Sequence, residues 1–336
     1  MEIYHNISLK PYHTFGIEVS GRKMIWLREA GEIYPLLSTE IFKEEFLILG
    51  GGSNILFSGN FEGNIIQLRS KGIKVIEEDD DRVILRVASG ETWEEFVGFA
   101  LENHYYGIEN LVGIPGWVGS SPVQNIGAYG IEAKDVITEV EAISLKTGET
   151  LIFDNKACEF DYRSSLFKNK LRREVLITHV HFTLSKKENY KLHYAGLQDI
   201  LAARKIPVNL RNVAQTVLEL RNLKLPDPQR IGSAGSFFKN PVISMSAGKE
   251  LMELYPGLIY YPFGKDRIKL AAGQLIDICG WKGYREGDVG VYPNQALVIV
   301  NYGNATGKEI VDFSQRIQRS VKEKFGVDII PEVNIV

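Results

Sequence analysis

The sequence predicts an α+β protein with more than one domain, and three observations support this. The chain has 336 residues, more than one hydrophobic core usually organises. Strand patterns with short helices fill residues 15–185, whereas helices become prominent after about residue 190. The pattern lacks the regular strand–helix alternation of a doubly wound parallel sheet. We therefore expect an α+β fold with a domain boundary between about residues 190 and 225.

In the first half, the hydrophobic pattern predicts mostly strands. Val83, Leu85 and Val87 alternate with polar residues, as a half-buried strand requires. Thr92 and Glu95 form a capping-box pattern that begins a helix. The predicted elements are strands at 46–49, 55–57, 82–88 and 175–184, a helix at 92–105, a hairpin at 137–153 that turns at Thr147-Gly148, and a solvated turn at the acidic run 77–81.

In the second half, helical spacing dominates. Val213, Val217 and Leu220 share one stripe of a predicted helix. The last helix begins at the capping-box pair Thr306 and Glu309 and ends at Gly326. Its predicted buried residues are Ile310, Phe313, Ile317 and Val321. The other predicted elements are helices at 209–223, 246–254 and 271–279, a strand at 296–301 and a short strand in the tail 328–336.

Composition and charge exclude several classes of protein. With 44% hydrophobic and 24% charged residues the chain is expected to fold, and its net charge of −3 gives no footprint for nucleic acid or an anionic membrane. No apolar run reaches the roughly 18 residues of a membrane helix, and the polar N-terminus does not match a signal peptide. We therefore expect a cytoplasmic protein with no nucleic-acid or membrane partner.

Cysteine and histidine give no clear metal site. Cys158 and Cys279 lie far apart and outside any CxxC pattern, which excludes a disulfide framework and a cysteine zinc site. We expect both to be small buried side chains. His179 and His181 share one strand face, where they could chelate a metal or simply pack. With no HExxH pattern in the chain, we predict no metal.

Two glycine-rich segments are the first candidates for a binding site. Gly50–Asn54 follows a predicted strand, and its glycines let backbone N–H groups converge on an anion. It matches neither the GxGxxG fingerprint nor the GxxxxGK[ST] loop, and its alternative role is a tight turn between buried strands. Gly113–Gly130 holds five glycines among uncharged donors and apolar side chains, which a plain surface loop would not need. Two such loops in one domain indicate a ligand of dinucleotide size.

Two further segments carry candidate catalytic side chains. Arg163 lies between an aromatic and two hydroxyl residues, where its guanidinium can fork onto a carboxylate, although an isolated surface arginine would look the same. Ser236 lies in a glycine-flanked turn before two aromatics and Lys239, and is a candidate nucleophile, proton donor or phosphate ligand. The absence of a GxSxG elbow disfavours an α/β-hydrolase.

Taken together, these segments resemble the UDP-N-acetylenolpyruvoylglucosamine reductase family, MurB. The matching pieces span nearly the whole chain and include GIPGxVGSSPxQNIGAYG and AGSFFKNP. They are His13–Ile17, Leu49–Asn54, Gly113–Gly130, Tyr162-Arg163, Gly235–Pro241, Leu270–Gly273 and Pro331-Glu332. Tyr194–Leu197 and Lys224–Pro228 resemble a subgroup with an extra segment that closes over the substrate.

The resemblance implies a fold that periodicity alone did not show. It implies an FAD-binding region of two α+β subdomains, of the vanillyl-alcohol-oxidase/PCMH type, followed by a C-terminal α+β substrate domain. The expected boundaries are 1–70 and 71–210 for the FAD-binding subdomains, 211–326 for the substrate domain, and 327–336 for a tail that returns to the first subdomain. Related oxidases tether FAD through a histidine in the first loop; Ser53 stands here, so FAD is expected to be noncovalent.

The implied activity is the NADPH-dependent reduction of UDP-N-acetylglucosamine enolpyruvate to UDP-N-acetylmuramate, by a monomer. By family analogy, Arg163 and Glu332 hold an enol-like state and Ser236 donates a proton to it. The implied substrate-binding residues are Tyr162, Tyr194, Lys224, Asn240 and Gln295. The implied cofactor-binding residues are Gly50, Gly51, Gly52, Ser53, Asn54, Ile114, Pro115, Gly116, Gly119, Ser120, Ser121, Gln124, Asn125, Gly127, Ala128 and Tyr129.

Departures from the family pattern are small, and two other functions remain to be weighed. Ser164 stands where many members carry Asp, and Ser233 where Asn is common.

An O₂-using oxidase of the same flavin fold would have a tethering residue in the first loop and no AGSFFKNP segment. A non-catalytic nucleotide-sugar binder would not need Arg163, Ser236 and Glu332 together. The sequence favours the reductase over both.

Overall fold

The computed structural model covers residues 1–336 and describes all of them except the side chain of Ala195, which belongs to the predicted Tyr194–Leu197 motif. The chain forms two compact units. Unit 1 comprises residues 1–7, 21–51 and 62–221, and unit 2 comprises residues 8–20, 52–61 and 222–336. Both units are discontinuous in sequence, and each is described by itself below. The domain boundaries expected from the sequence remain a proposal.

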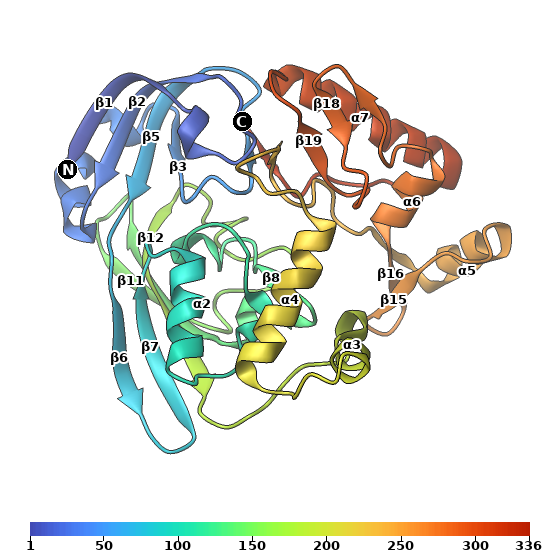
Figure 1. Cartoon of the computed structure of the whole chain (residues 1–336). Coiled ribbons are helices and arrows are strands. Elements are labelled where there is room, and N and C mark those ends of the chain that lie inside the picture. The colour runs from blue at the N-terminus through green and yellow to red at the C-terminus, as the bar shows by residue number, and fades with distance from the viewer. The chain divides into compact units, whose positions relative to one another are not determined.

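Unit 1 is built around a five-stranded antiparallel sheet in the order β11-β10-β12-β7-β6 (Figure 1). Helix α2 (Trp93–Glu102) covers one face through Trp93 and Phe96, which both contact the ring of Phe182. The capping box predicted at Thr92 is present. The strands are β6 (Ile73–Glu78), β7 (Arg82–Ala88), β10 (Ile137–Ser144), β11 (Thr150–Asp154) and β12 (Val175–Ser185), which confirms the predicted strands and hairpin of this region.

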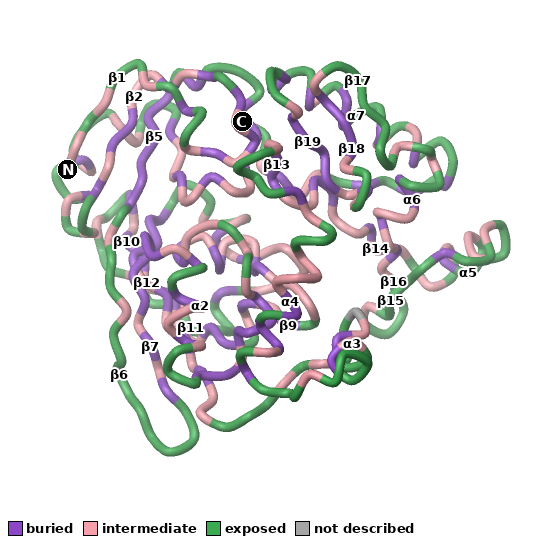
Figure 2. The backbone as a smooth tube through the Cα atoms, viewed as in Figure 1, coloured by how far each residue is buried: buried purple, intermediate pink, exposed green. Residues whose placement is uncertain are grey.

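Two predictions in this region are wrong in detail. Glu77 and Glu78 belong to strand β6 and not to a turn. They pair with β7 through the backbone while their side chains stay in solvent, because β6 is an exposed edge strand (Figure 2). Helix α2 ends at Glu102, earlier than the predicted residue 105. Asn103 caps the helix and His104 has a left-handed φ of 57°, so the helical path cannot continue.

A second sheet of unit 1 leads into the first glycine-rich loop. Its order is β1-β2-β5-β3, and β3 runs parallel to β5. Strand β3 ends where Gly50 begins the loop, and its Phe46 shares a core with Ile66 and Leu68. The remaining elements of this unit are β1 (Glu2–Ser8), β2 (Ser20–Leu27), β3 (Phe46–Ile48), β5 (Phe61–Leu68), β8 (Gly127–Ala128), β9 (Ile131–Glu132), α1 (Tyr34–Leu37), α3 (Leu197–Ala203) and α4 (Leu210–Lys224).

Unit 2 holds two small sheets and a parallel strand pair. The sheet orders are β13-β19-β18-β17 and β14-β16-β15, and the tail strand β20 (Asn334–Ile335) pairs in parallel with β4 (Ile55–Leu56). The sheet strands are β13 (Gly232–Ser233), β14 (Val242–Ser244), β15 (Tyr260–Phe263), β16 (Arg267–Leu270), β17 (Arg285–Glu286), β18 (Val289–Val291) and β19 (Ile299–Asn301). The helices are α5 (Met245–Leu254), α6 (Ala272–Ile278) and α7 (Gly307–Phe325).

The helices predicted in unit 2 and its tail strand are confirmed, including the capping box at Thr306 and the left-handed cap at Gly326. The predicted strand 296–301 is shorter and begins at Ile299. Residues 292–298 form turns instead, in which Tyr292 N donates to Val298 O at 2.8 Å. The predicted strand 296–301 is therefore a turn in its first part and a strand in its last part. Hydrophobic periodicity cannot distinguish the two parts of such a short apolar run.

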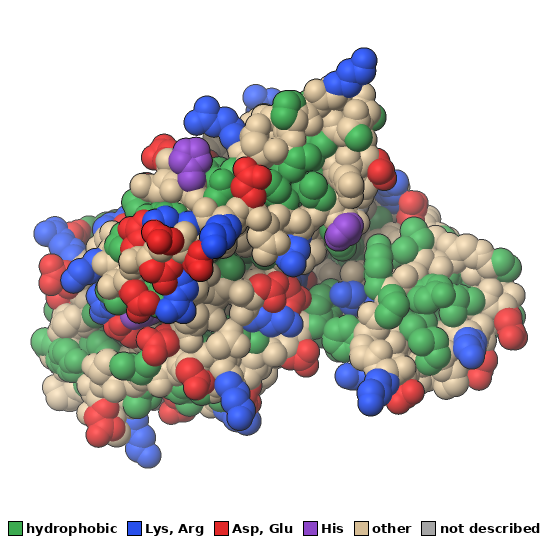
Figure 3. All heavy atoms as spheres, turned by 90° about the horizontal axis from the view of Figure 1, so that it is seen from below, with side chains coloured by type: hydrophobic (Ala, Val, Ile, Leu, Met, Phe, Trp, Pro, Cys, Tyr) green, Lys and Arg blue, Asp and Glu red, His purple; other side chains and the backbone are tan. Residues whose placement is uncertain are grey.

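The face of the molecule that Figure 3 shows has no single-sign charge field. Acidic and basic side chains are intermixed over the face that Figure 3 shows, which agrees with the small net charge of −3. Of the helices in the described part of the chain, none has the length and apolar character needed to cross a membrane.

Candidate active site

The two glycine-rich loops predicted as a cofactor site contact each other within unit 1. A Cβ atom added to Gly51 would lie 3.0 Å from the Cα of Gly116, and one added to Gly50 would lie 3.2 Å from Ser120 Oγ. Side chains at these positions would push the loops apart. Gln67 Nε2 donates to Gly50 O at 3.0 Å and fixes the first loop from strand β5. The glycines thus let the backbones of the two loops approach each other closely.

The second loop is held by the residues just after strand β7. Val118 N donates to Glu91 O and Trp93 N donates to Gly116 O, both at 2.9 Å. Gly119 lies so close to Ser89 that an added Cβ would be 1.7 Å from Ser89 Oγ. These contacts hold the loop backbone against the segment that follows strand β7.

Several polar side chains predicted to contact the cofactor bond within the protein. Ser121 Oγ donates to Val118 O at 2.7 Å and Ser120 Oγ donates to Trp117 O at 2.7 Å. The fully buried Asn125 amide donates to Glu132 Oε2 at 3.0 Å and to Asp161 O at 3.1 Å. These three side chains shape the loop, so a ligand would meet mainly its backbone and glycine surface.

Arg163 lies against the second loop, as the prediction of a shared site requires. Its Nη2 donates to Gly127 O at 2.6 Å and its Nη1 donates to Asn125 O at 3.3 Å. Its guanidinium carbon lies 5.6 Å from the ring centroid of Tyr162. These contacts orient the guanidinium beside the loop.

Left-handed backbone is concentrated here. Asn125, Tyr129 and Arg163 have φ values of 46°, 48° and 52°. Asparagine tolerates this region, whereas a tyrosine and an arginine pay a conformational cost in it. Such strain is typical of sites where geometry serves a function.

Tyr194 lies beside the end of the same loop. Its ring makes an edge contact with Tyr129 at 6.1 Å between centroids, and an added Cβ on Gly130 would lie 3.3 Å from Tyr194 Cβ. The residue remains 48% exposed.

In unit 2, the rest of the first loop is clamped by the His13–Ile17 segment. Gly52 has a φ of 66°, and an added Cβ would lie 1.9 Å from Tyr12 O. Thr14 N donates to Gly52 O at 3.1 Å, and Thr14 O accepts from Ser233 N at 3.0 Å. The Thr14 backbone therefore links the cofactor loop to the segment that carries Ser236.

Ser236 and Glu332, far apart in sequence, lie in neighbouring segments of unit 2. Glu332 N donates to Phe237 O at 2.7 Å, directly after Ser236. Asn54 Nδ2 donates to Glu332 O at 3.4 Å, and Asn334 Nδ2 donates to Asn54 O at 3.0 Å. Unit 2 thus brings together the predicted proton donor, the predicted acid and the end of the first glycine-rich loop.

The substrate-binding residues predicted in unit 2 lie at two positions, beside helix α6 and at the end of helix α4. Asn240 Oδ1 accepts from Ala272 N at 2.9 Å at the start of α6, and Gln295 Oε1 lies 3.2 Å from a Cβ built on Gly273 in the same helix. Lys224 is exposed at the end of α4. Asn294, the residue before Gln295, donates from its Nδ2 to Leu223 O at 3.1 Å. Leu223 immediately precedes Lys224 in the sequence.

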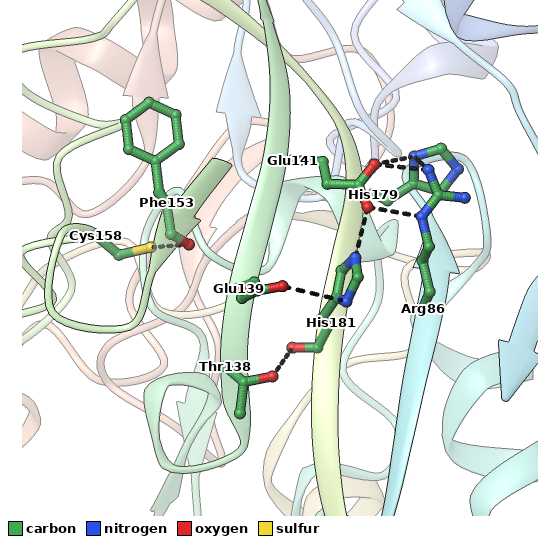
Figure 4. Close-up of polar contacts among 8 residues, drawn as sticks. All are labelled: Arg86, Thr138, Glu139, Glu141, Phe153, Cys158, His179 and His181. Atoms are coloured by element: carbon green, nitrogen blue, oxygen red, sulfur yellow. Dashed lines mark hydrogen bonds and ion pairs between the residues drawn. The ribbon is translucent and has the colours of Figure 1, made fainter. Parts of the chain in front are cut away.

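The histidine pair weighed as a metal site belongs to an ion-pair cluster. Figure 4 shows Arg86, His179 and His181 gathered around Glu141 from strands β7, β12 and β10. Arg86 Nε and Nη2 donate to Glu141 at 2.7 and 2.6 Å, and His181 Nε2 lies 2.6 Å from Glu141 Oε1. Mainly because of the Arg86 guanidinium, the pKa of Glu141 is lowered to about 2. No metal-binding group of three His, Cys, Asp or Glu occurs among the described residues.

The two cysteines differ. Cys158 is fully buried, and burial raises the pKa of its thiol to about 12. Its Sγ lies 3.9 Å from Phe153 O (Figure 4). Cys279 is only half-buried, so the prediction that both are buried is wrong for it. It follows helix α6 directly, where the last turn faces partly to solvent.

Sequence reasoning missed the residues that hold the loops. Gln67, Ser89 and Asn110 are all buried, and Asn110 Nδ2 donates to Tyr129 O at 2.8 Å. No motif marks them. A polar residue in an otherwise apolar strand, such as Gln67 in β5, is the one signal that could have found them.

Two family models match the chain. The model for an FAD binding domain matches residues 40–154, and the model for the UDP-N-acetylenolpyruvoylglucosamine reductase C-terminal domain matches residues 227–336. The first includes both glycine-rich loops. FAD as the cofactor and an FAD-binding fold are therefore confirmed.

Relatives match over the full length. UDP-N-acetylenolpyruvoylglucosamine reductase of Flavobacterium johnsoniae is 43% identical over 339 residues and covers 100% of both chains. The enzyme of the same name from Chromobacterium violaceum is 44% identical, with 97% of each chain covered. The crystal structure of the reductase from Thermus caldophilus matches with a TM-score of 0.69 and 24% identity over 100% of this chain and 99% of its own, which shows a shared fold.

We expect Gly52→Ala to disrupt the first loop. The added Cβ would meet the Tyr12 carbonyl, which is backbone and cannot rotate away, and the left-handed φ adds strain. Thermal unfolding should show a free energy of unfolding that is lower by about 1–3 kcal/mol. Fluorescence titration should show weaker FAD binding. Gly59→Ala, in the same segment and with open space around it, is the control. Equal behaviour of the two variants would contradict the clamp.

We expect Glu141→Gln to lower the free energy of unfolding at pH 5 by about 1–3 kcal/mol, since hydrogen bonds to charged groups contribute on that scale. Glu141 has a lowered pKa in the fold, so its contribution is complete above about pH 4.5 and is lost as the pH falls towards about 2. Urea unfolding of wild type and variant between pH 5 and pH 2.5 should therefore converge. The control is Glu139→Gln on the same strand, whose side chain is 47% exposed. A constant difference across this range would refute the assignment.

Proposed function

The chain belongs to the UDP-N-acetylenolpyruvoylglucosamine reductase family, and on that premise we propose how its residues carry out the reduction. The substrate is the enolpyruvyl ether of UDP-N-acetylglucosamine, and the product is UDP-N-acetylmuramate, a peptidoglycan precursor. When bound, FAD supplies the hydride received from NADPH, and this hydride adds to the terminal carbon of the substrate's C=C bond.

The observation that carries the proposal is the meeting of Ser236, Glu332 and Asn54 in unit 2. The Glu332 backbone bonds to Phe237 on one side and to Asn54 on the other. A proton donor placed beside the cofactor loop is what a reduction by hydride and then proton requires. The Thr14 link between Gly52 and Ser233 supports the same arrangement.

Arg163 stabilises the negative charge that hydride addition creates. That charge develops on the carbon adjacent to the hydride acceptor and spreads into the substrate carboxylate. A guanidinium that is always protonated and oriented by the carbonyls of Asn125 and Gly127 suits this task. Preorganisation avoids the cost of reorienting it during the reaction.

Ser236 donates the proton that completes the reduction. Its hydroxyl is a very weak acid, so it can protonate only a strongly basic carbanion or enolate, which is what hydride addition produces. The serine is then reprotonated from solvent, and the net change is one hydride and one proton added across the double bond. Glu332 beside a negative intermediate acts either as a protonated carboxyl or by orienting a water.

The residues that the family resemblance implies for substrate binding hold the UDP-sugar. Lys224 is exposed and suits the pyrophosphate by charge, and the exposed Tyr194 lies next to Tyr129. Asn240 and Gln295, both at helix α6, complete the predicted set with Tyr162. We further propose a cytoplasmic monomer that holds FAD noncovalently, since Ser53 replaces the tethering histidine of related oxidases.

The two half-reactions can be tested separately. Purified protein should be yellow, and anaerobic NADPH should bleach the flavin absorbance. Addition of UDP-N-acetylglucosamine enolpyruvate should then restore the absorbance without oxygen. Recovery with O₂ alone would favour an oxidase, and a colourless protein that does not take up FAD would exclude the whole assignment.

We expect Ser236→Ala to separate the half-reactions. Flavin reduction by NADPH should proceed at the wild-type rate, while reoxidation by the UDP-sugar slows about 10²–10⁴-fold, the usual contribution of a positioned acid. Stopped-flow absorbance measures both rates. Ser246→Ala, an exposed serine of helix α5, serves as the matched control. Equal loss of both half-reactions in Ser236→Ala would show that Ser236 is structural.

A further inference from the structure

Arg221 lies on the buried stripe of helix α4. Val213 and Val217 are fully buried on this helix, and Arg221 follows Val217 by four residues, on the same helical face. The residue as a whole is half-buried, and its Nε is shielded from solvent and has no hydrogen-bond partner. A charged residue in the apolar stripe of an amphipathic helix is unusual and calls for a partner.

Its protein neighbours do not neutralise this charge. The guanidinium donates from Nη2 to Gly113 O at 3.1 Å. In the described part of the chain, Arg221 forms no ion pair with a carboxylate. Burial lowers its pKa, but arginine keeps its proton in proteins, so the positive charge persists. A buried charge without a counterion is costly, which indicates that an anion completes the site.

The contacts of Arg221 identify where that anion lies. Gly113 is the first residue of the second glycine-rich loop, and a Cβ built on it would lie 3.4 Å from Arg221 Nε. Tyr129, near the end of the same loop, lies within electrostatic range of the Arg221 guanidinium. The guanidinium thus contacts the start of the loop and lies near its end, and the loop lies inside the FAD binding domain match at residues 40–154.

We infer that the Arg221 guanidinium binds an anionic group of the flavin nucleotide held by the Gly113–Gly130 loop. The inference deepens the proposed function and rests on its cofactor. Two parts of the nucleotide offer the chemistry: the pyrophosphate, which is always anionic, and the ring, which gains negative charge on reduction. Arg221 is therefore a binding residue for the cofactor, in addition to those predicted from sequence.

The test compares Arg221→Met with wild type and with Arg211→Met, an exposed arginine of the same helix. Apo-protein is examined by thermal unfolding, and FAD affinity by fluorescence titration. The flavin midpoint potential is measured by dye equilibration, and the KM for the UDP-sugar by steady-state kinetics. Arg221→Lys, which keeps the charge but not the fork, is the rescue variant.

The expected result has two parts. Arg221→Met should leave the apo-protein as stable as wild type or more stable, because a buried unpaired charge is removed. Its FAD affinity should fall about 10–100-fold, the loss expected for a charge-assisted hydrogen bond, with Arg221→Lys in between. An unchanged potential would place the anion at the pyrophosphate. If the variant loses more affinity for reduced than for oxidised flavin, the midpoint potential should fall by about 30 mV for each tenfold difference. Such a fall would place the anion at the ring.

Three results would overturn the inference. In the first, Arg221→Met binds FAD as tightly as wild type at an unchanged potential. In the second, Arg221→Met destabilises the apo-protein, and Arg221→Lys loses as much FAD affinity as Arg221→Met does. In the third, only the KM for the UDP-sugar rises, which would assign Arg221 to the substrate. A wild-type protein that takes up no FAD would instead refute the cofactor and the proposed function together.

Discussion

The close approach of two glycine-rich backbones is the constraint on which the site depends. Between Gly51 and Gly116 there is no room for a Cβ, and Gly119 lies against Ser89 in the same way. Neighbouring elements maintain this contact, since backbone bonds from Glu91 and Trp93 fix the second loop and Gln67 fixes the first. A cradle of backbone can approach a ligand more closely than one of side chains, which suits a nucleotide.

The polar groups of the site divide into those that hold the loops and those that remain for chemistry. Ser120, Ser121 and Asn125 bond within the protein and fix loop geometry. Positive charge comes instead from arginines that contact the same loop, Arg163 at Asn125 and Gly127 and Arg221 at Gly113. With a net charge of only −3 the protein has little overall charge to attract an anion, so the proposed anion binding depends on the local placement of these two guanidinium groups.

Long elements with a clear period were predictable, and several short ones were not. Helix α7 combined a capping box, an apolar stripe and a terminal glycine, and all three signals agreed with the structure. Strand β6 was misread at Glu77 because an exposed edge strand has no apolar face to show a period. The two-residue strands β13 and β17 are too short to show a period.

The sequence by itself determined the α+β class, the main helices and strands of both units, and the segments that carry the site, because periodicity, caps and glycine-rich motifs are local signals. Tertiary structure alone decided that Thr14 links Gly52 to Ser233, that Glu332 lies beside Phe237, and that the Asn125 amide is consumed inside the loop. It also decided that the Nε of Arg221 is shielded from solvent without a hydrogen-bond partner among the described residues. The physical reason is that burial and pairing of a polar group depend on which distant segments surround it, and local sequence carries no record of them.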